Sequence, residues 1–438
     1  MGILDRMFGR SLRVGAPRTA SIGMLKRELT ETLKRGERQA ALALCDDILA
    51  RAPDDQVALL AAAVNRLKTG DPERAAAHFA RLEELASGGA RTARLVSESL
   101  MDPARAGRGE AYVAALDDVL VDTNFWSVIQ GKRIFTRETQ ARTVSNSPLV
   151  RGRVTPDHRQ CVITLPRVPE RLDRIETPCV LLGSDGNYAH WVLRNVLKLA
   201  LIEAARVPAD APFLVRDDLR GWEQAYLTLL AIPEARLLRV PTDRIVRCRR
   251  LYVPTQLRNH PRMADGIAWL RAKLASHSAP PDPARALVYA SRREQSKRRL
   301  LNEVQVEEVL AQQGFRVIVP GEMTVQEQIA AFSCARVVVA PHGAGLANMV
   351  FAPPGASMVE ITNSAIVHMD EFRYLCKAAG HHAVSVVSQD MDAVPATDSG
   401  PAMHRDYRVN VEELRAVVRE VLAAHTVHTA QERTRGAP

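Results

Sequence analysis

The sequence predicts an α/β protein made of two successive Rossmann-like domains, preceded by a small all-α helical repeat segment. Apolar β-like runs alternate with amphipathic helical segments from about residue 178 to residue 425. This alternation is typical of parallel sheets covered by helices on both faces. A chain of 438 residues also exceeds what one ordinary core accommodates. The expected divisions are a flexible N-terminus (1–23), the helical segment (24–105), a first Rossmann-like domain (106–260), a second one (261–425) and a flexible tail (426–438).

A 34-residue spacing indicates the helical repeat. Gly36 and Gly70 are 34 residues apart, and Ala41 and Ala75 repeat the same spacing. The pattern resembles the tetratricopeptide repeat, in which small residues let paired helices touch. Fewer units are visible than a free-standing solenoid needs, so we expect the segment to pack on another part of the chain and to offer a surface to a protein partner. A plain helical hairpin with chance spacing is the alternative.

The strands and helices of the two Rossmann-like domains follow from the hydrophobic pattern, which is weak over residues 110–175 and regular afterwards. In the first domain we expect strands at 178–183, 212–217, 236–240 and 245–253, and helices at 190–205 and 218–231. A long helix starts within 258–269, and a Pro-rich break follows at 276–284. In the second domain we expect strands at 287–291, 315–320, 336–340, 357–361 and 382–387, and helices at 302–313, 324–333, 345–351, 368–379 and 410–425. Two such domains leave a cleft beyond the carboxyl ends of their strands, where ligands bind.

Composition narrows the range of partners. The net charge of +9, which is dominated by Arg, suits phosphorylated ligands, although a codon bias toward Arg is the main expected cause of this composition. Aromatic residues make up only 5% of the chain and are not interleaved with a basic helix, so we do not expect nucleic acid to bind. The six Cys are scattered without a C-x-x-C pair, which favours buried thiols in a reducing compartment.

The chain contains no run of about 18–20 apolar residues, so we expect no transmembrane segment. The opening Met1–Gly15 is basic and mildly amphipathic, which allows peripheral contact with an anionic membrane surface. A frayed terminus is the alternative. The expected location is therefore cytoplasmic, with the inner face of the membrane as an extension of it.

The strongest chemical signal is the turn from Pro341 to Gly345, where a buried strand runs into a helix. Glycines let a phosphate approach the unpaired amides at the helix start, and the helix dipole favours its negative charge. A structural strand-to-helix turn would look similar. The residues that we expect to bind a phosphorylated ligand here are His342, Gly343, Ala344, Gly345 and, one turn into the helix, Asn348.

The longer string Val337–Ile361 resembles the sequence hallmark of glycosyltransferase family 61. In that family the pattern is PHGAGLTN, then F-x-P-x-G, then a strand ending VEI. Ala347 replaces the family's Thr, whereas Phe351, Pro353, Gly355 and Val359-Glu360-Ile361 match. The resemblance implies a GT-B-like pair of Rossmann-like domains and a nucleotide-sugar donor. It also implies that Glu360 meets the ribose hydroxyls of that donor, while a carboxylate that caps the following turn is the alternative.

A second match lies at 289–315 and resembles the family's strand, S-R, basic loop and N-E helix pattern. Arg292 and Arg293 follow a strand, so their guanidinium groups are expected to clamp the donor diphosphate. The more distant basic residues of this loop, Lys297 to Arg299, are expected to be solvated. Asn302 is expected to cap the helix, with Glu303 in its first turn complementing the helix dipole.

A third match, at 186–191, resembles the family's G-N-Y-x-H-W segment. An inverting transfer needs a base that takes the proton of the acceptor hydroxyl. Histidine titrates near neutral pH, so His190 is our candidate base, with Asp185 acting directly or orienting it. A histidine that is satisfied at a helix start is the alternative. The residues expected on the acceptor side are Asn187, Tyr188 and Trp191.

These matches, which span roughly residues 115–425, imply an inverting glycosyltransferase that uses a nucleotide sugar as substrate and needs no separate cofactor. No convincing D-x-D triplet ends a strand, so we expect no metal, and helix amides and arginines would neutralise the leaving diphosphate. The expected acceptor is a polysaccharide, another glycan or a lipid-linked glycan, in capsule, exopolysaccharide or other cell-surface glycan synthesis. The alternative is a non-catalytic nucleotide- or glycan-binding module, or a scaffold, of a polysaccharide assembly system. The family's closing strand usually carries an Asp, and this chain has Val409-Asn410-Val411 there.

Overall fold

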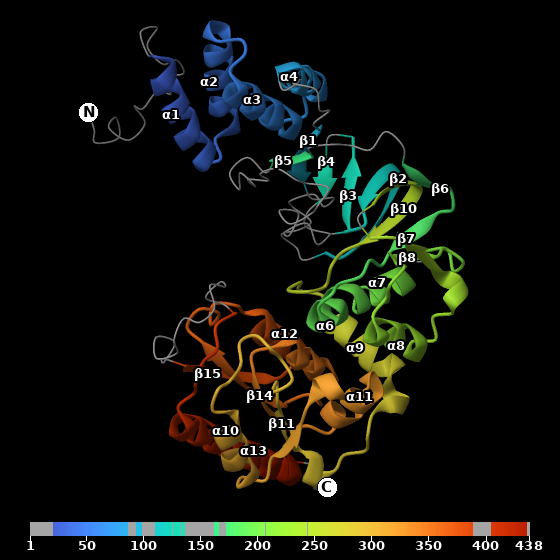
Figure 1. Cartoon of the computed structure of the whole chain (residues 1–438), viewed down its shortest axis with the longest axis vertical. Coiled ribbons are helices and arrows are strands. Elements are labelled where there is room, and N and C mark those ends of the chain that lie inside the picture. Colours follow the sequence, from blue (N-terminus) through green and yellow to red (C-terminus); the bar gives the residue numbers. More distant parts are fainter. Residues whose placement is uncertain are drawn as a thin grey trace, which may run out of the picture. The chain divides into compact units, whose positions relative to one another are not determined.

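The computed structural model describes residues 21–85, 93–98, 110–124, 126–131, 133–135, 162–165, 172–205, 207–242, 244–388 and 404–435. The chain divides into two compact units. Unit 1 comprises residues 1–100, 117–176 and 242–249, and unit 2 comprises residues 101–116, 177–241 and 250–438. The protein is a mixed α/β protein with helices at its N-terminal end (Figure 1). The boundaries expected from the sequence at residues 105, 260 and 425 stay predictions.

Unit 1 begins with four helices, α1 (Ile22–Lys34), α2 (Arg38–Arg51), α3 (Gln56–Lys68) and α4 (Pro72–Leu85). Gly36 and Gly70 end the first helix of each pair with φ angles of 75° and 85°, a left-handed conformation that glycine adopts without strain. Ala41 and Ala75, at most 1% exposed, lie where the paired helices meet. The sequence was therefore right to predict paired helices at a 34-residue spacing, whereas the likeness to the tetratricopeptide repeat stays a resemblance.

The other described elements of unit 1 are strands. They are β1 (Ala93–Glu98), most of β2 (Val113–Asp122), β3 (Ser127–Gln130), β4 (Arg133–Phe135), β5 (Val162–Leu165), β6 (Asp173–Ile175) and the first half of β10 (Ile245–Pro254). β1 pairs antiparallel with β5 and parallel with β4. The sequence pattern was read as helical up to residue 105, but residues 93–98 are a strand.

The first sheet of unit 2 is parallel and contains β7 (Cys179–Leu181), β8 (Phe213–Arg216), β9 (Leu237–Val240) and the second half of β10. All four strands were expected from the sequence. The helix expected at 190–205 is divided into a short α6 (Tyr188–His190), a π-helical turn η4 (Trp191–Val196) and α7 (Leu199–Ala204). Helix α8 (Gly221–Leu229) and the 3₁₀ turn η5 (Glu234–Arg236) complete this layer.

The second sheet of unit 2 has five parallel strands in the order β12-β11-β13-β14-β15. Their bounds are β11 Leu287–Ala290, β12 Arg316–Ile318, β13 Val337–Pro341, β14 Ser357–Asn363 and β15 His382–Ser388. Helix α9 (Met263–Lys273) and the 3₁₀ turns η6 (Ala275–His277) and η7 (Pro283–Arg285) precede it. The other helices are α10 (Glu303–Ala311), α11 (Val325–Ser333), α12 (Glu371–Ala379) and α13 (Val411–Arg435), with the 3₁₀ turns η8 (Pro320–Glu322) and η9 (Ala344–Phe351).

Alternating side chains of this sheet enter two different layers. Val337 and Val339 of β13 pack with α10 and α13, while Val338 and Ala340 pack on the opposite face with α11, α12 and η9. Helices therefore cover both faces, as the near-continuous apolar strands predict. The helix expected at 345–351 is present, but it is 3₁₀ rather than α.

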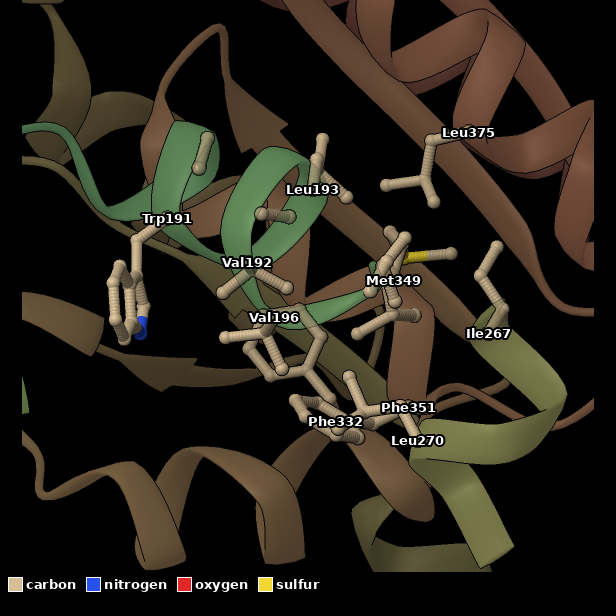
Figure 2. Close-up of a cluster of buried hydrophobic side chains, with 14 of the residues drawn as sticks. Trp191, Val192, Leu193, Val196, Ile267, Leu270, Phe332, Met349, Phe351 and Leu375 are labelled. Carbon is tan, nitrogen blue, oxygen red and sulfur yellow. The ribbon is translucent and has the colours of Figure 1, made fainter. Parts of the chain in front are cut away.

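One hydrophobic core joins the two sheets of unit 2. Side chains of the π-helical turn, including Trp191 and Val196, share it with side chains from four other helical elements (Figure 2). The labelled members are Ile267 and Leu270 of α9, Phe332 of α11, Met349 and Phe351 of η9, and Leu375 of α12. Because this core is continuous, the two sheets of unit 2 are packed as one body.

The cysteines that the structure describes are free thiols and all are buried. Burial raises the pKa of Cys45 and Cys376 to about 12, so both remain protonated. Among the described residues, no helix is long and apolar enough to cross a membrane.

Candidate functional site

The strand order of the second sheet locates a binding position before any side chain is considered. From β11 the chain moves outward to β12 on one side, and from β13 it moves outward to β14 on the other. The order therefore reverses between β11 and β13, and open α/β sheets bind ligands beyond the carboxyl ends of the strands at this point. Two of the segments predicted to be functional follow these strands, namely the loop after Ala290 and the turn after Pro341.

The end of β11 is fixed by one carboxylate oxygen. Glu303 Oε1 accepts hydrogen bonds from Tyr289 Oη (2.7 Å), Ser291 Oγ (2.9 Å) and the backbone N–H of Arg292 (3.1 Å). Glu303 therefore does more than complement the dipole of α10, because it sets the direction in which the chain leaves the strand. The bond from Glu303 to the N–H of Arg292 fixes the backbone from which the Arg292 side chain extends.

Arg292 spans the gap between the two strand ends. Its guanidinium lies against Gly343, so that a Cβ at Gly343 would come within 2.3 Å of Arg292 Nε. Since φ of Gly343 is −179°, glycine is needed there for space and not for backbone freedom. Arg292 Nη1 donates only to the backbone oxygen of Arg298, at 3.3 Å, and forms no ion pair with a described carboxylate.

A second guanidinium, that of Arg298, lies on the same loop. Its Nε is buried without a hydrogen-bond partner among the described residues. Burial is the main cause that lowers the pKa of both Arg292 and Arg298, and Arg292 adds to the effect on Arg298. Arginine keeps its proton in proteins, so two positive charges are held here, half-buried and without an ion pair to a described carboxylate. The sequence predicts a solvated Arg298. This prediction is wrong, because Arg298 is half-buried and its Nε is buried.

The loop that carries Arg292 and Arg298, the arginine loop, is held in place by a short strap, residues 404–410. The backbone N–H groups of Arg298 and Leu301 donate to the carbonyl oxygens of His404 (3.0 Å) and Tyr407 (2.8 Å). Asn302 exchanges two hydrogen bonds with the backbone of Val409, of 2.9 and 3.1 Å. Asn302 was expected to cap α10; it occupies the cap position, but its side chain makes no capping bond because Val409 takes it.

In the same strap, Asn410 accepts from the N–H groups of Glu412 (3.0 Å) and Glu413 (3.2 Å). This asparagine stands in the segment where the resembling family usually has an Asp. Capping the start of α13 gives it a structural role.

His342, which directly follows β13, and Glu360 of β14 form a buried pair. His342 Nδ1 lies 2.6 Å from Glu360 Oε1, and Ser385 Oγ donates to Glu360 Oε2 at 3.2 Å. The side chains of His342 and Glu360 are 9% and 4% exposed. Glu360 lies inside β14, and both of its oxygens are occupied by protein groups. Contact with a ribose, as implied by the resemblance, would require one of these bonds to be replaced.

Asn348, expected to bind the donor, lies in a buried hydrogen-bond chain. Tyr188 Oη donates to Asn348 Oδ1 at 2.7 Å, and Asn348 Nδ2 donates to Gln328 Oε1 at 2.7 Å. Tyr226 Oη lies 2.9 Å from Tyr188 Oη, and burial raises the pKa of both phenols well above the usual value. Asn348 is 0% exposed, so it is closed to a ligand in this structure. This chain of hydrogen bonds joins the segment that contains His190 to the turn after β13.

His190 and Asp185 form a second histidine–carboxylate pair, at the end of β7. His190 Nδ1 lies 3.2 Å from Asp185 Oδ2 and 3.3 Å from Oδ1, and the His190 side chain is 30% exposed. Asn187 caps the short helix by accepting from the N–H of His190 (3.2 Å), and its own N–H donates to Asp185 (3.1 Å). Arg194 Nη1 lies 3.4 Å from Asp185 Oδ2. The imidazole is therefore oriented through Nδ1, while no described residue bonds Nε2.

The remaining predicted site residues fall into two groups. Ala344 and Gly345 are half-buried at the start of η9, where helix amides lack carbonyl partners. Arg293 instead contacts Glu307 of α10 at 3.4 Å on the surface, and Trp191 is 0% exposed in the shared core. The side chain of Arg293 thus contacts α10, and Trp191, which was expected on the acceptor side, is closed to a ligand in this structure. Among the described residues, no three His, Cys, Asp or Glu side chains gather as a metal site requires.

Among known families, residues 188–359 match the model of the family Glycosyltransferase 61. The matched segment contains His190, Arg292 and the turn at His342, and it supports glycosyltransferase activity and hence sugar donor and acceptor substrates. It begins after Asp185 and stops one residue before Glu360. No curated protein matches the chain.

Proposed function

We propose that unit 2 is an inverting glycosyltransferase that transfers a sugar from a nucleotide-sugar donor to a glycan acceptor. The observation that supports this most directly is the pair of half-buried guanidinium groups, Arg292 and Arg298, of which Arg292 lies against the turn at Gly343. Two half-buried cations that form no ion pair with a described carboxylate favour a ligand with several negative oxygens. A nucleoside diphosphate has this character, and it would lie where the strand order reverses.

The same groups can stabilise the leaving diphosphate without a metal ion. Negative charge grows on the diphosphate as the bond to the sugar breaks, and fixed cations and helix amides stabilise charge at that stage. Gly343 allows Arg292 to reach this position, since any larger residue would displace the guanidinium. We therefore include metal independence in the proposal.

His190 is the proposed general base. With Nδ1 facing Asp185, the Nε2 lone pair is free to take the proton of the acceptor hydroxyl, and the resulting imidazolium is stabilised by Asp185. The acceptor oxygen attacks the anomeric carbon from the face opposite the diphosphate, so the sugar configuration inverts. The two parallel sheets of unit 2 support a GT-B-like assignment, with capsule, exopolysaccharide or other cell-surface glycans as products.

Donor binding tests the proposal. We expect one nucleoside diphosphate from a panel to bind by calorimetry, and Arg292→Ala to weaken it on the order of ten- to a hundredfold, because a charge-assisted contact of roughly 1.5–3 kcal/mol is lost. Arg293→Ala is the matched control, since Arg293 already contacts Glu307 at the surface, and it should change the affinity by less than about twofold.

Equal affinities in Arg292→Ala and the wild type would contradict the assigned diphosphate position. The configuration of the newly formed glycosidic bond, read by NMR, tests inversion, and unchanged turnover in a metal chelator tests metal independence. Donor binding without any transfer or donor hydrolysis would favour the binding-module alternative.

A further inference from the structure

Arg220, which belongs to none of the three motif segments, lies beside the His190–Asp185 pair. The guanidinium of Arg220, at the end of the loop after β8, lies over the backbone of Gly186, whose Cβ, if present, would be 3.3 Å from Arg220 Nη2. Gly186 directly follows Asp185. Any side chain at Gly186 would therefore press against the guanidinium, which is otherwise exposed.

A buried carboxylate fixes the two loops to each other. Glu223, 0% exposed, accepts from Ser184 Oγ (2.5 Å) and the N–H of Asp185 (3.1 Å) through Oε1, and from the N–H of Arg220 (2.9 Å) through Oε2. Strands β7 and β8 are neighbours, so their loops already leave the sheet side by side. Glu223 thus places the backbone of Arg220 and the backbone of Asp185 on one anchor.

Arg220 is not paired with a described carboxylate at ion-pair distance, although the pKa of Asp218 is lowered mainly by its hydrogen bond from Arg216 and also by the charge of Arg220. No ion pair within 4.0 Å is formed by Arg220 with the described residues, and Asp218 in the same loop is already held by Arg216 through bonds of 2.5 and 2.7 Å. Asp185 is shared by His190 and Arg194. Glu223 is buried and its oxygens accept from Ser184 and from two backbone N–H groups. The guanidinium of Arg220 is therefore exposed beside His190 and is not held in an ion pair by these carboxylates.

We infer that the acceptor carries an anionic group close to the hydroxyl that is glycosylated, and that Arg220 binds this group. The inference rests on the proposed function, because it assigns the partner of His190. Two sources share the required chemistry, namely the carboxylate of an acidic sugar and the phosphate of a lipid-linked diphosphate. In both, negative oxygens would bind a guanidinium in a bidentate manner while the neighbouring hydroxyl faces His190 Nε2.

The position of Arg220 argues against the donor as its ligand. The proposed donor groups follow β11 and β13 of the second sheet, whereas Arg220 follows β8 of the first. Arg220 is fixed through Glu223 to the loop of the base and shares no contact with the arginine loop. Arg220 is thus a specificity residue for the acceptor, and removing it should leave donor affinity unchanged.

The experiment compares matched pairs of probes that differ only in charge. One pair is a glucuronate-containing tetrasaccharide and its carboxyl-reduced form, and the other is a short prenyl-diphosphate-linked sugar and the free sugar. Binding to the full-length protein is followed by NMR, with the His190 ring signals reporting proximity. We expect the anionic member of at least one pair to bind at least about tenfold more tightly than its neutral partner and to shift the His190 signals. The pair that does so identifies the source.

Arg220→Ala should remove this preference, and Arg220→Lys should restore part of it. Arg239→Ala is the control, because it removes the same charge from the neighbouring strand, where Glu234 already holds the guanidinium at 2.6 and 3.1 Å. Nucleoside diphosphate affinity is measured on the same samples. Equal binding of charged and neutral probes to the wild type, or weaker nucleoside diphosphate binding in Arg220→Ala, would overturn the inference. A wild type that binds anionic glycans but no nucleoside diphosphate would sink the proposed function and leave the Arg220 site standing.

Discussion

Two histidine–carboxylate pairs among the described residues of unit 2 lie in or after parallel strands, and they differ in burial. The pair His342–Glu360 is separated by 2.6 Å and is nearly excluded from water, with Glu360 held further by Ser385. The pair His190–Asp185 is separated by 3.2 Å, and almost a third of the His190 side chain is exposed. Both pairs join a histidine to a carboxylate, but Glu360 lies inside β14, whereas Asp185 lies in the loop after β7.

The difference separates a structural pair from a chemical one. A base must present a free nitrogen to a substrate, which a half-exposed imidazole oriented through Nδ1 can do. A buried imidazole with a short bond to a fully satisfied carboxylate instead holds two strands and the turn between β13 and η9.

The largest effect is expected at the exposed pair. His190→Ala should lower turnover by roughly 10²- to 10⁴-fold, the usual contribution of a general base, while donor affinity stays within about twofold of wild type. A turnover assay paired with calorimetric donor titration measures both. Wild-type turnover would remove His190 as the base, and a parallel loss of donor affinity would show that the pair is structural.

At the buried pair the expected loss is in stability. Glu360→Gln should lower the free energy of unfolding by about 1–3 kcal/mol, because Gln replaces one of the two acceptors that His342 and Ser385 use in a site without water. Glu307→Gln, which weakens only a surface contact with Arg293, should change it by less than about 0.5 kcal/mol. Urea unfolding of both variants decides, and equal stabilities would contradict the structural role.

The smallest effect is expected at the hydrogen bond that joins the segment of Tyr188 and His190 to Asn348 of η9. Tyr188→Phe removes the hydroxyl that bonds Asn348 and should cost about 0.5–1.5 kcal/mol of unfolding free energy. Tyr374→Phe is the control, since the Tyr374 hydroxyl makes no hydrogen bond to any described residue. If the two variants unfold at the same urea concentration, the Tyr188–Asn348 bond does not join the segments.

The strands and most helices of unit 2 could be predicted from the sequence, because buried parallel strands are short apolar runs separated by amphipathic helices. The π-helical turn at Trp191–Val196 could not, since most of its residues are buried and apolar and local periodicity does not distinguish one extra residue per turn. The strand at 93–98 was missed because the repeat pattern was extended beyond α4.

Sequence motifs pointed to Arg292, His342 and His190, and the first two lie just after β11 and β13, as expected; that these three residues form the site stays a prediction. Arg298, Glu223 and Arg220 were out of reach, because their roles depend on contacts with residues that are distant in sequence or on burial. The carbonyl of His404 holds the loop of Arg298, and the backbones of two adjacent strand-end loops meet at Glu223. Asn348 shows the opposite error, since a motif position that suggested a ligand is filled by Tyr188 and Gln328.

The core shared by the two sheets has a consequence for how unit 2 melts and moves. Trp191, Phe332 and Leu375 lie in one apolar cluster, so separating the sheets would expose most of it (Figure 2). Unit 2 should therefore absorb heat in a single calorimetric transition, and a fragment cut within the Pro-rich connection at 276–284 should not fold alone. For the same reason, hinge bending between the sheets is too costly to accompany each turnover, and any closure over substrates falls to the loops at the strand ends.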